Sequence, residues 1–367
     1  MTDERPPVRL RPEIAALPAY RQGRTAASDG FKLSSNENPF DPLTGILEAI
    51  AAAVDINRYP DATARELREK LAPRFGVGVD EVHVGAGSVS LLSQFINAAA
   101  GPGDEVLYSW RSFEAYPGLV TVSGARSVTV PNLPDGRHDL PAMAAAVTDR
   151  TRVVLVCSPN NPTGGVVTAE EFSAFMAAVP ADLLVLLDEA YAEFVRDDAA
   201  VEGHALVGMY PNLVILRTFS KAWGLAGLRL GYAIGPERVL DAARAAAIPL
   251  SVTGPAQAAG AAALDHEAEL VARVEHIVAR RTEVRDALLE AGLPVMESQG
   301  NFVWLPLAAD AEFAADVLND HGLVTRAFPG DGVRVSIGEA ESVAKLKQAA
   351  VDIVENLPTR PQSSRID

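Results

Sequence analysis

The feature that most constrains the fold is a regular alternation of short apolar runs and helical stretches between residues 82 and 235. The runs are rich in valine and leucine and carry polar residues mainly at their ends: Val82–Gly85, Glu105–Ser109, Ser127–Val130, Val153–Cys157, Leu183–Leu187, Leu213–Arg217 and Leu228–Ile234. Such runs are typical of strands buried on both faces of a sheet. Helical segments between them indicate β-α-β crossovers, so we predict an α/β fold with a mostly parallel, seven-stranded sheet.

The C-terminal third predicts a smaller α+β domain. One long amphipathic helix is expected over Asp265–Ala291, with Gly292 as its stop signal, and a final helix over Glu341–Glu355. Three strand-like runs lie between them: Asn301–Leu307, Leu323–Phe328 and Val333–Ile337. We therefore expect an N-terminal arm (1–34) that belongs to the small domain, a large domain (35–264), a small domain (265–356) and a flexible tail (357–367).

A helix is also expected upstream of the first strand. Thr63 and Glu66 have the spacing of a capping box, which marks a helix start. Leu67, Leu71 and Phe75 then recur at intervals of four residues, so they should share one buried face.

Composition excludes several classes of function. The net charge of −16 argues against a nucleic acid or an anionic membrane as partner. No apolar run approaches the ~18 residues of a membrane span, and the N-terminus lacks the apolar core of a secretory signal. The single cysteine, Cys157, lies in an apolar run and fits a reducing compartment, so we expect a cytoplasmic protein. The six histidines show no ligand spacing, and we expect no metal.

Lys221 is the first candidate for chemistry. It follows an apolar strand, and partial burial there lowers the pKa of a lysine and frees its amine for imine formation. Ser220 directly before it and Arg229 eight residues after it could hold a phosphate. This combination suggests pyridoxal 5′-phosphate (PLP), although an exposed loop lysine is the alternative for this stretch alone.

Polar side chains follow two further strands of the predicted sheet. Asp188 ends an apolar strand, where a carboxylate needs either an arginine partner or a protonated ring nitrogen such as that of PLP. Tyr191, three residues later, could reach the phenolic oxygen of that ring. Asn161, in the turn after Cys157, offers an amide donor at a strand end, although a plain turn explains it equally well.

Three more groups are weaker signals. The turn Gly85–Ser88 opens a helix and could bind phosphate through backbone N–H groups, but it is neither a full dinucleotide fingerprint nor a P-loop. Aromatic residues in the segment 109–116 could stack on a flat ring or simply pack in the core. Arg326 and Arg334 could each hold a carboxylate or a phosphate, or lie on the surface.

The order of these groups along the chain resembles that of the fold-type I PLP-dependent aminotransferases. The resemblance runs from about Leu10 to Glu355 and is greatest to the histidinol-phosphate aminotransferase branch, through Ser35–Pro39, Asn57–Pro60 and Leu225–Tyr232. Within that branch, three segments look most like the actinobacterial aromatic amino acid aminotransferases: Gly87–Ser90, Trp110–Glu114 and Asn301–Leu307.

This resemblance implies a role for each matching residue on the cofactor. Lys221 would bind PLP covalently and move a proton, Asp188 would pair with the ring nitrogen, and Phe113 would stack on the ring, with Trp110 as its rival. The phenolic oxygen would accept hydrogen bonds from Asn161 and Tyr191. The phosphate would be held by Gly87, Ser88, Ser220 and Arg229.

The resemblance also implies substrates and a partner. Four residues would meet the substrate: Tyr20, Asn36, Arg326 and Arg334. The branch is dimeric with active sites at the subunit interface, and Tyr59 would reach the phosphate in the partner subunit. The substrates would be an amino acid and a 2-oxo acid, which react in two half-reactions on one cofactor.

The substrate itself is less constrained than the chemistry. Histidinol phosphate and an aromatic amino acid each combine a flat ring, an amine and an anionic group, and arginine binds both anions. The subfamily resemblance favours aromatic amino acids with 2-oxoglutarate, with histidinol phosphate as the alternative. A further alternative is a PLP decarboxylase or lyase on the same scaffold. Another is a nucleotide-binding dehydrogenase, or a non-enzymatic binding protein, that uses the Gly85–Ser88 turn.

Overall fold

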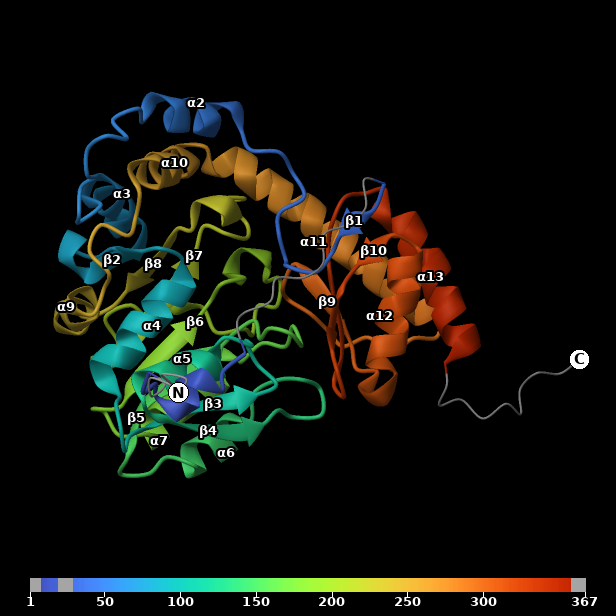
Figure 1. Cartoon of the computed structure of the whole chain (residues 1–367), viewed down its shortest axis with the longest axis horizontal. Coiled ribbons are helices and arrows are strands. Elements are labelled where there is room, and N and C mark those ends of the chain that lie inside the picture. Colours follow the sequence, from blue (N-terminus) through green and yellow to red (C-terminus); the bar gives the residue numbers. More distant parts are fainter. Residues whose placement is uncertain (1–7, 19–28, 358–367) are drawn as a thin grey trace, which may run out of the picture.

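The computed structural model describes residues 8–18 and 29–357 of the 367-residue chain. Its large domain contains a seven-stranded sheet with the strand order β2-β8-β7-β6-β5-β3-β4 (Figure 1). The strands are β2 (Val82–Gly85), β3 (Glu105–Trp110), β4 (Arg126–Pro131), β5 (Thr151–Cys157), β6 (Leu184–Asp188), β7 (Leu213–Thr218) and β8 (Gly231–Ile234). Only β8 runs antiparallel to its neighbours, which confirms the predicted mostly parallel sheet.

Helices cover both faces of this sheet. On one face, alternate strand residues such as Val153 and Leu155 pack against three helices: α4 (Ser88–Ala99), α5 (Tyr116–Ser123) and α9 (Glu237–Ala245). On the other face, the intervening residues Val154 and Val156 belong to a core shared with α2 (Thr44–Ala52), α3 (Arg65–Phe75), α6 (Leu140–Ala145), α7 (Ala169–Ala178) and α10 (Gly254–Asp265). This two-residue alternation is what a strand buried on both faces requires.

The small domain is built on a three-stranded antiparallel sheet with the order β11-β12-β9. Its strands are β9 (Phe302–Leu305), β11 (Arg326–Phe328) and β12 (Gly332–Ser336). The expected single strand over Leu323–Phe328 is wrong, because Thr325 separates β11 from β10 (Leu323–Val324). β10 pairs instead with β1 (Phe31–Lys32) in a separate parallel ribbon.

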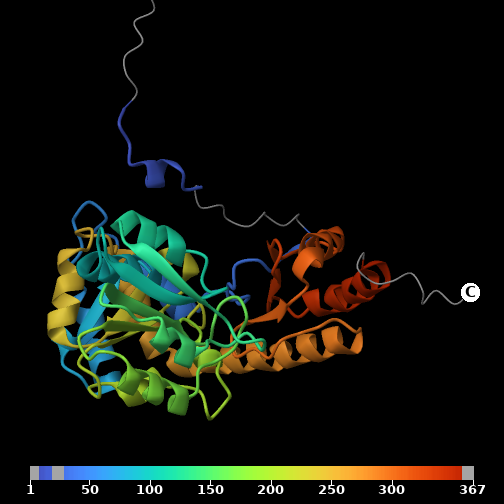
Figure 2. The ribbon, with the colours of Figure 1, turned by 90° about the horizontal axis from the view of Figure 1, so that it is seen from below.

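Three helices complete the small domain: α11 (Glu267–Glu290), α12 (Ala311–Asp320) and α13 (Ser342–Asn356). Figures 1 and 2 show α11 running from the edge of the large domain along the small one. With 24 residues it is about 36 Å long. Its bounds agree with the predicted helix to within two residues, and His266 separates it from α10.

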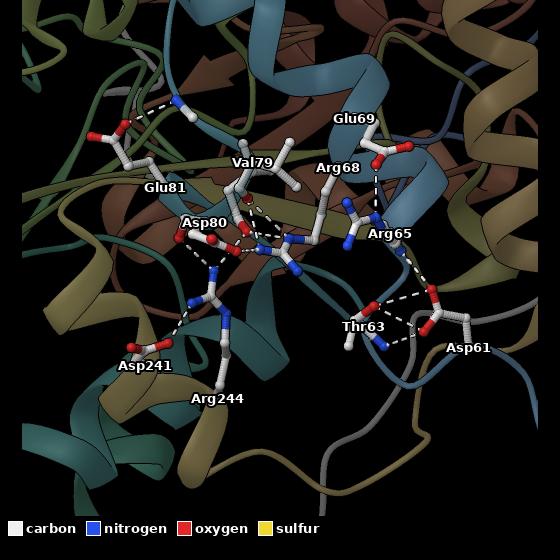
Figure 3. Close-up of polar contacts among 12 residues, drawn as sticks. Asp61, Thr63, Arg65, Arg68, Glu69, Val79, Asp80, Glu81, Asp241 and Arg244 are labelled. Atoms are coloured by element: carbon white, nitrogen blue, oxygen red, sulfur yellow. Dashed lines mark hydrogen bonds and ion pairs between the residues drawn. The ribbon is translucent and has the colours of Figure 1, made fainter.

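The expected capping box at the start of α3 is wrong. Thr63 lies one residue before the N-cap, Ala64, and its hydroxyl donates to the Asp61 carboxylate at 2.8 Å (Figure 3). The same carboxylate accepts the backbone N–H of Arg65 at 2.8 Å. Asp61 therefore satisfies the first turn of the helix, while Leu67, Leu71 and Phe75 are buried as predicted.

Arg68 anchors α3 to the start of the large sheet. Its guanidinium donates to Val79 O at 2.7 Å, to Val82 O at 2.8 Å and to the Asp80 carboxylate at 2.8 Å (Figure 3). Because Val82 is the first residue of β2, these bonds fix the strand that leads into the Gly85–Ser88 turn.

The described parts of the N-terminal segment touch both domains. Arg11, before α1 (Pro12–Ala15), donates to the backbone oxygens of Thr121 and Val122 on α5. Further along, Phe31 pairs with Leu323 in the small domain. Among the helices of the described residues, none is long and apolar enough to cross a membrane.

Candidate active site

Most of the predicted cofactor-binding residues meet at one edge of the large sheet. Asn161 follows β5, Asp188 ends β6 and Lys221 follows β7, and these three strands are parallel neighbours. The carboxyl ends of parallel strands share one edge, and ligands of open α/β sheets bind there. The turn after β2 and Arg229, just before the antiparallel β8, lie at the same edge.

Lys221 is a partly buried amine with a lowered pKa. Its Nζ donates to the backbone oxygen of Ser35 at 2.9 Å. Burial, and then the positive charge of Arg334, lower the pKa of Lys221 from 10.5 to about 7. A large fraction of this amine is therefore neutral near pH 7, and the neutral amine is the form that attacks a carbonyl carbon.

Asp188 is buried and retains one unsatisfied oxygen. Its Oδ2 accepts a 2.8 Å hydrogen bond from the Tyr116 hydroxyl, whereas Oδ1 has no hydrogen-bond partner among the described residues. Burial raises the pKa of Asp188 from 3.8 to about 6, against the lowering effect of the Tyr116 hydrogen bond. A buried carboxylate oxygen without a donor fits a site that receives a positively charged N–H group.

Tyr116 is a partner of Asp188 that the sequence did not reveal. It is the first residue of α5 and is fully buried. Asp188 faces it because residues 184, 186 and 188 of β6 share one side of the sheet, the side that α5 covers. The alternation along β6 could have shown which side Asp188 faces, but not which helix residue meets it.

Asn161, Arg334 and Asn36 bring both domains into the site. Arg334 on β12 donates to Asn161 Oδ1 and to Ser34 O, each at 2.6 Å. Asn36 donates to the Tyr191 hydroxyl at 3.0 Å, and Ser336 on β12 donates to Asn36 Oδ1 at 2.8 Å. These contacts connect the predicted carboxylate-binding arginine with the residues expected around the phenolic oxygen of the cofactor.

The turn after β2 has the geometry of an anion-binding site. Gly87 has φ = +83° and is the N-cap of α4, so Ser88 begins the helix. This φ favours glycine, and a Cβ atom on Gly87 would also lie 2.5 Å from Nη2 of Arg229, so the guanidinium would have to move. Arg229 also donates to Ser220 Oγ at 3.3 Å. The N-terminus of α4, the guanidinium of Arg229 and the hydroxyl of Ser220 thus meet at this turn.

The two aromatic candidates for ring stacking lie in different surroundings. Phe113 is half-buried and packs edge-on against Tyr116, with ring centroids 5.6 Å apart. Trp110, the last residue of β3, has the Arg111 guanidinium 4.4 Å from its ring centroid. Phe113 is therefore next to the tyrosine that contacts Asp188, whereas Trp110 is already covered by a cation.

The remaining predicted residues differ in how the structure places them. Arg326 lies directly opposite Arg334 across the β11–β12 pair, and its guanidinium binds both carboxylate oxygens of Glu114, at 2.9 and 3.0 Å. Tyr59 is 86% exposed, so the fold of a single chain does not enclose it. Tyr20 lies outside the described residues. No cluster of metal-ligating side chains occurs within residues 8–18 and 29–357.

Comparison with known proteins shows the family. Residues 28–351 match the family described as aminotransferase class I and II, so the chain belongs to this family. A protein of Streptomyces coelicolor named aromatic amino acid aminotransferase is 51% identical over 91% of this chain and 94% of its own length. One of the same name from Thermobifida fusca is 51% identical over 92% of this chain and 95% of its own.

A solved structure has the same fold. The histidinol-phosphate aminotransferase of Sinorhizobium meliloti, in complex with PLP, superposes with a TM-score of 0.85 and 29% identity over 95% of this chain and 98% of that one. These findings confirm the predicted fold-type I aminotransferase and its cofactor, PLP. They decide against the nucleotide-binding alternative for the Gly85–Ser88 turn.

Proposed function

We propose that this enzyme transfers the amino group of phenylalanine, tyrosine or tryptophan to 2-oxoglutarate in two half-reactions. Relatives that are about 50% identical to this chain over about 90% of its length are named aromatic amino acid aminotransferase. The site supports the chemistry, because a lysine with a lowered pKa, a buried carboxylate and an arginine from the other domain lie at one sheet edge.

The observation that best supports the position of the cofactor is the buried Oδ1 of Asp188, which has no hydrogen-bond partner among the described residues. A ring N–H would donate a hydrogen bond to this buried oxygen. The phosphate would be held by Arg229 and by the turn after β2 that contains Gly87. Bound PLP supplies an aldehyde for the amino group and an electron sink for breaking the Cα–H bond. The residues present therefore fit the cofactor at its ring nitrogen and at its phosphate.

The side chains of the chain would orient the substrate and move protons. The neutral Lys221 amine would accept the proton from Cα and deliver it again, because its pKa near 7 suits both directions. Arg334 would bind the substrate carboxylate through its planar fork. Asp188, held by Tyr116, would keep the ring nitrogen protonated, and Asn161 and Tyr191 would hydrogen-bond the phenolic oxygen.

A steady-state substrate panel tests the proposal. The purified enzyme is assayed with phenylalanine, tyrosine, tryptophan, aspartate and histidinol phosphate, each with 2-oxoglutarate. We expect kcat/KM to be highest for the aromatic amino acids. A far higher kcat/KM for histidinol phosphate would overturn the substrate assignment, and release of carbon dioxide without dependence on the 2-oxo acid would favour a decarboxylase.

We also propose that the working form is a homodimer in which Tyr59 reaches the cofactor phosphate of the partner subunit. Tyr59 and Ile56 are 86% and 84% exposed, and Val54 nearby is 68% exposed. Three exposed apolar side chains within six residues of one another in sequence are consistent with a protein–protein contact. A second copy of the chain would cover these residues and bring Tyr59 to a site that its own chain does not enclose.

A further inference from the structure

The aromatic ring of Phe328, on β11, lies among three guanidinium groups. The Cζ atoms of Arg111, Arg326 and Arg334 are 5.4, 6.0 and 5.8 Å from its centroid. Two of these arginines bind carboxylates across the boundary between the domains. Nε of Arg111 donates to Asp331 at 2.8 Å, and Arg326 binds Glu114 through both carboxylate oxygens.

The third arginine, Arg334, has different surroundings from its neighbour Arg326. Its hydrogen bonds to Asn161 and Ser34 go to neutral oxygens, and its side chain is buried. Arg326, on the adjacent strand, forms an ion pair with Glu114, and the two side chains are 27% and 26% exposed. At this degree of shielding a carboxylate contact weakens the attraction of a guanidinium for any further anion.

We propose that Glu114 sets the charge selectivity of the substrate site by occupying the guanidinium of Arg326. The inference rests on the proposed function, in which Arg334 binds the substrate's anionic group. A substrate carboxylate carries one negative charge, and the fork of Arg334 suffices for it. A phosphate monoester carries close to two and would need a second cation, which Arg326 could supply only by leaving Glu114.

Glu114 is thus a specificity-determining residue that favours a singly charged group, such as a carboxylate, over a phosphate at the position of Arg334, without itself binding the substrate. Its position follows from the fold, because Glu114 is adjacent in sequence to Phe113 while Arg326 pairs with Arg334 across β11 and β12. The pair therefore joins the segment expected above the cofactor ring to the strand that carries the carboxylate-binding arginine.

The test compares two ligands that differ in the anion: 3-phenylpropionate and 3-phenylpropyl phosphate. Their dissociation constants are measured on the PLP-loaded enzyme by calorimetry. We expect Glu114→Gln to strengthen phosphate binding relative to carboxylate binding about tenfold, which corresponds to about 1.4 kcal/mol. Arg326→Gln should shift the ratio in the opposite direction, because it leaves the Glu114 carboxylate without its cation.

Asp331→Asn is the matched control, since it removes the same charge from the other pair around Phe328. We expect Asp331→Asn to change the ratio of phosphate to carboxylate binding by less than Glu114→Gln does. Combining Glu114→Gln with Arg326→Gln should abolish the gain in phosphate binding. An unchanged ratio in Glu114→Gln, or an equal gain in Asp331→Asn, would overturn the inference. Failure of the proposed function would show separately, as a preference of the wild-type enzyme for histidinol phosphate in the substrate panel.

Discussion

Burial shifts the pKa values of Lys221 and Asp188 toward each other. It lowers that of the amine to about 7 and raises that of the carboxyl to about 6. In both cases the low-dielectric surroundings oppose the charged form. Both groups can therefore exchange protons near neutral pH, and each shift has a measurable consequence.

The lowered pKa of Lys221 predicts how cofactor capture depends on pH. Below about pH 7 the amine is protonated and unreactive, so the capture rate of the cofactor-free enzyme should rise about tenfold per pH unit and level off above pH 7. The rate is followed by visible absorbance, with Lys221→Ala as the control. An inflection near pH 10 would show an ordinary lysine, and repeating the titration with pyridoxal separates the contribution of the phosphate.

The raised pKa of Asp188 predicts how stability depends on pH in the cofactor-free protein. Between pH 4 and 6 the folded state binds a proton at Asp188 that the unfolded chain releases, so the contribution of Asp188 to the free energy of unfolding should fall as pH rises, by about 3 kcal/mol. Asp188→Asn should remove this dependence. Urea unfolding of both proteins at several pH values measures it, and parallel profiles would contradict the shift.

The sequence predicted which candidate residues lie at the sheet edge better than it predicted their contacts. Lys221, Asp188 and Asn161 could be found because each follows an apolar strand, and strand ends meet at one edge. Tyr116 and Glu114 could not be assigned in this way. Their partners, Asp188 and Arg326, lie 72 and 212 residues away, and such contacts depend on how helices and domains pack.

At the scale of elements, α3 illustrates how local signals can name the wrong residue. Thr63 and Glu66 have the spacing of a capping box, but Ala64 adopts a left-handed conformation with φ = +48° and shifts the helix start by one residue. The Asp61 carboxylate then accepts the N–H of Thr63, which Glu66 was expected to satisfy, and the N–H of Arg65 in the first turn. Two competing caps within three residues cannot be ranked from sequence alone.

This arrangement predicts that Asp61→Ala destabilises the protein by about 1 kcal/mol, the usual effect of losing a helix cap. Glu69→Ala on the same helix is the matched control. It removes an exposed ion pair with Arg65 and should change stability by less than about 0.5 kcal/mol. Denaturant unfolding compares the two variants, and equal losses would argue against a capping role for Asp61.

The central strands of the large sheet, β5, β6 and β7, were predictable because their residues are mostly apolar on both faces. The strands of the small domain were less predictable. Leu323–Phe328 is one strand-like run in the sequence, but the structure divides it between two sheets at Thr325. The partner that divides it, β1, is nearly three hundred residues away in the sequence. The helix α10 was also missed, although Thr253 as N-cap and a proline in the first turn signal its start.

At the scale of the whole molecule, the proposed dimer predicts complementation between two defective variants. Lys221→Ala lacks the reactive amine, and Tyr59→Ala should bind the cofactor weakly. If Tyr59 acts on the partner subunit, a mixed dimer contains one site with both residues intact. Co-expressed and purified mixed dimers should then regain up to about half of the wild-type activity per dimer.

Two outcomes would contradict this arrangement. A monomeric enzyme with full activity in sedimentation and assay would exclude a shared site. Mixed dimers without recovered activity, despite measurable activity in the Tyr59→Ala homodimer, would show that Tyr59 serves its own chain. Mixed dimers of Lys221→Ala with Asp188→Ala are the control, because both residues belong to one site and neither mixed site is complete.

The pairing of β1 with β10 has a consequence for the order of events during synthesis. Residues 31–36 emerge early, but their partners Leu323, Val324 and Ser336 emerge about 300 residues later. The large sheet, which uses residues 82–234, can form long before that. Asn36 therefore gains its Ser336 partner only after the residues of the large sheet have emerged, so a nascent chain can hold a finished scaffold before its candidate substrate site is finished.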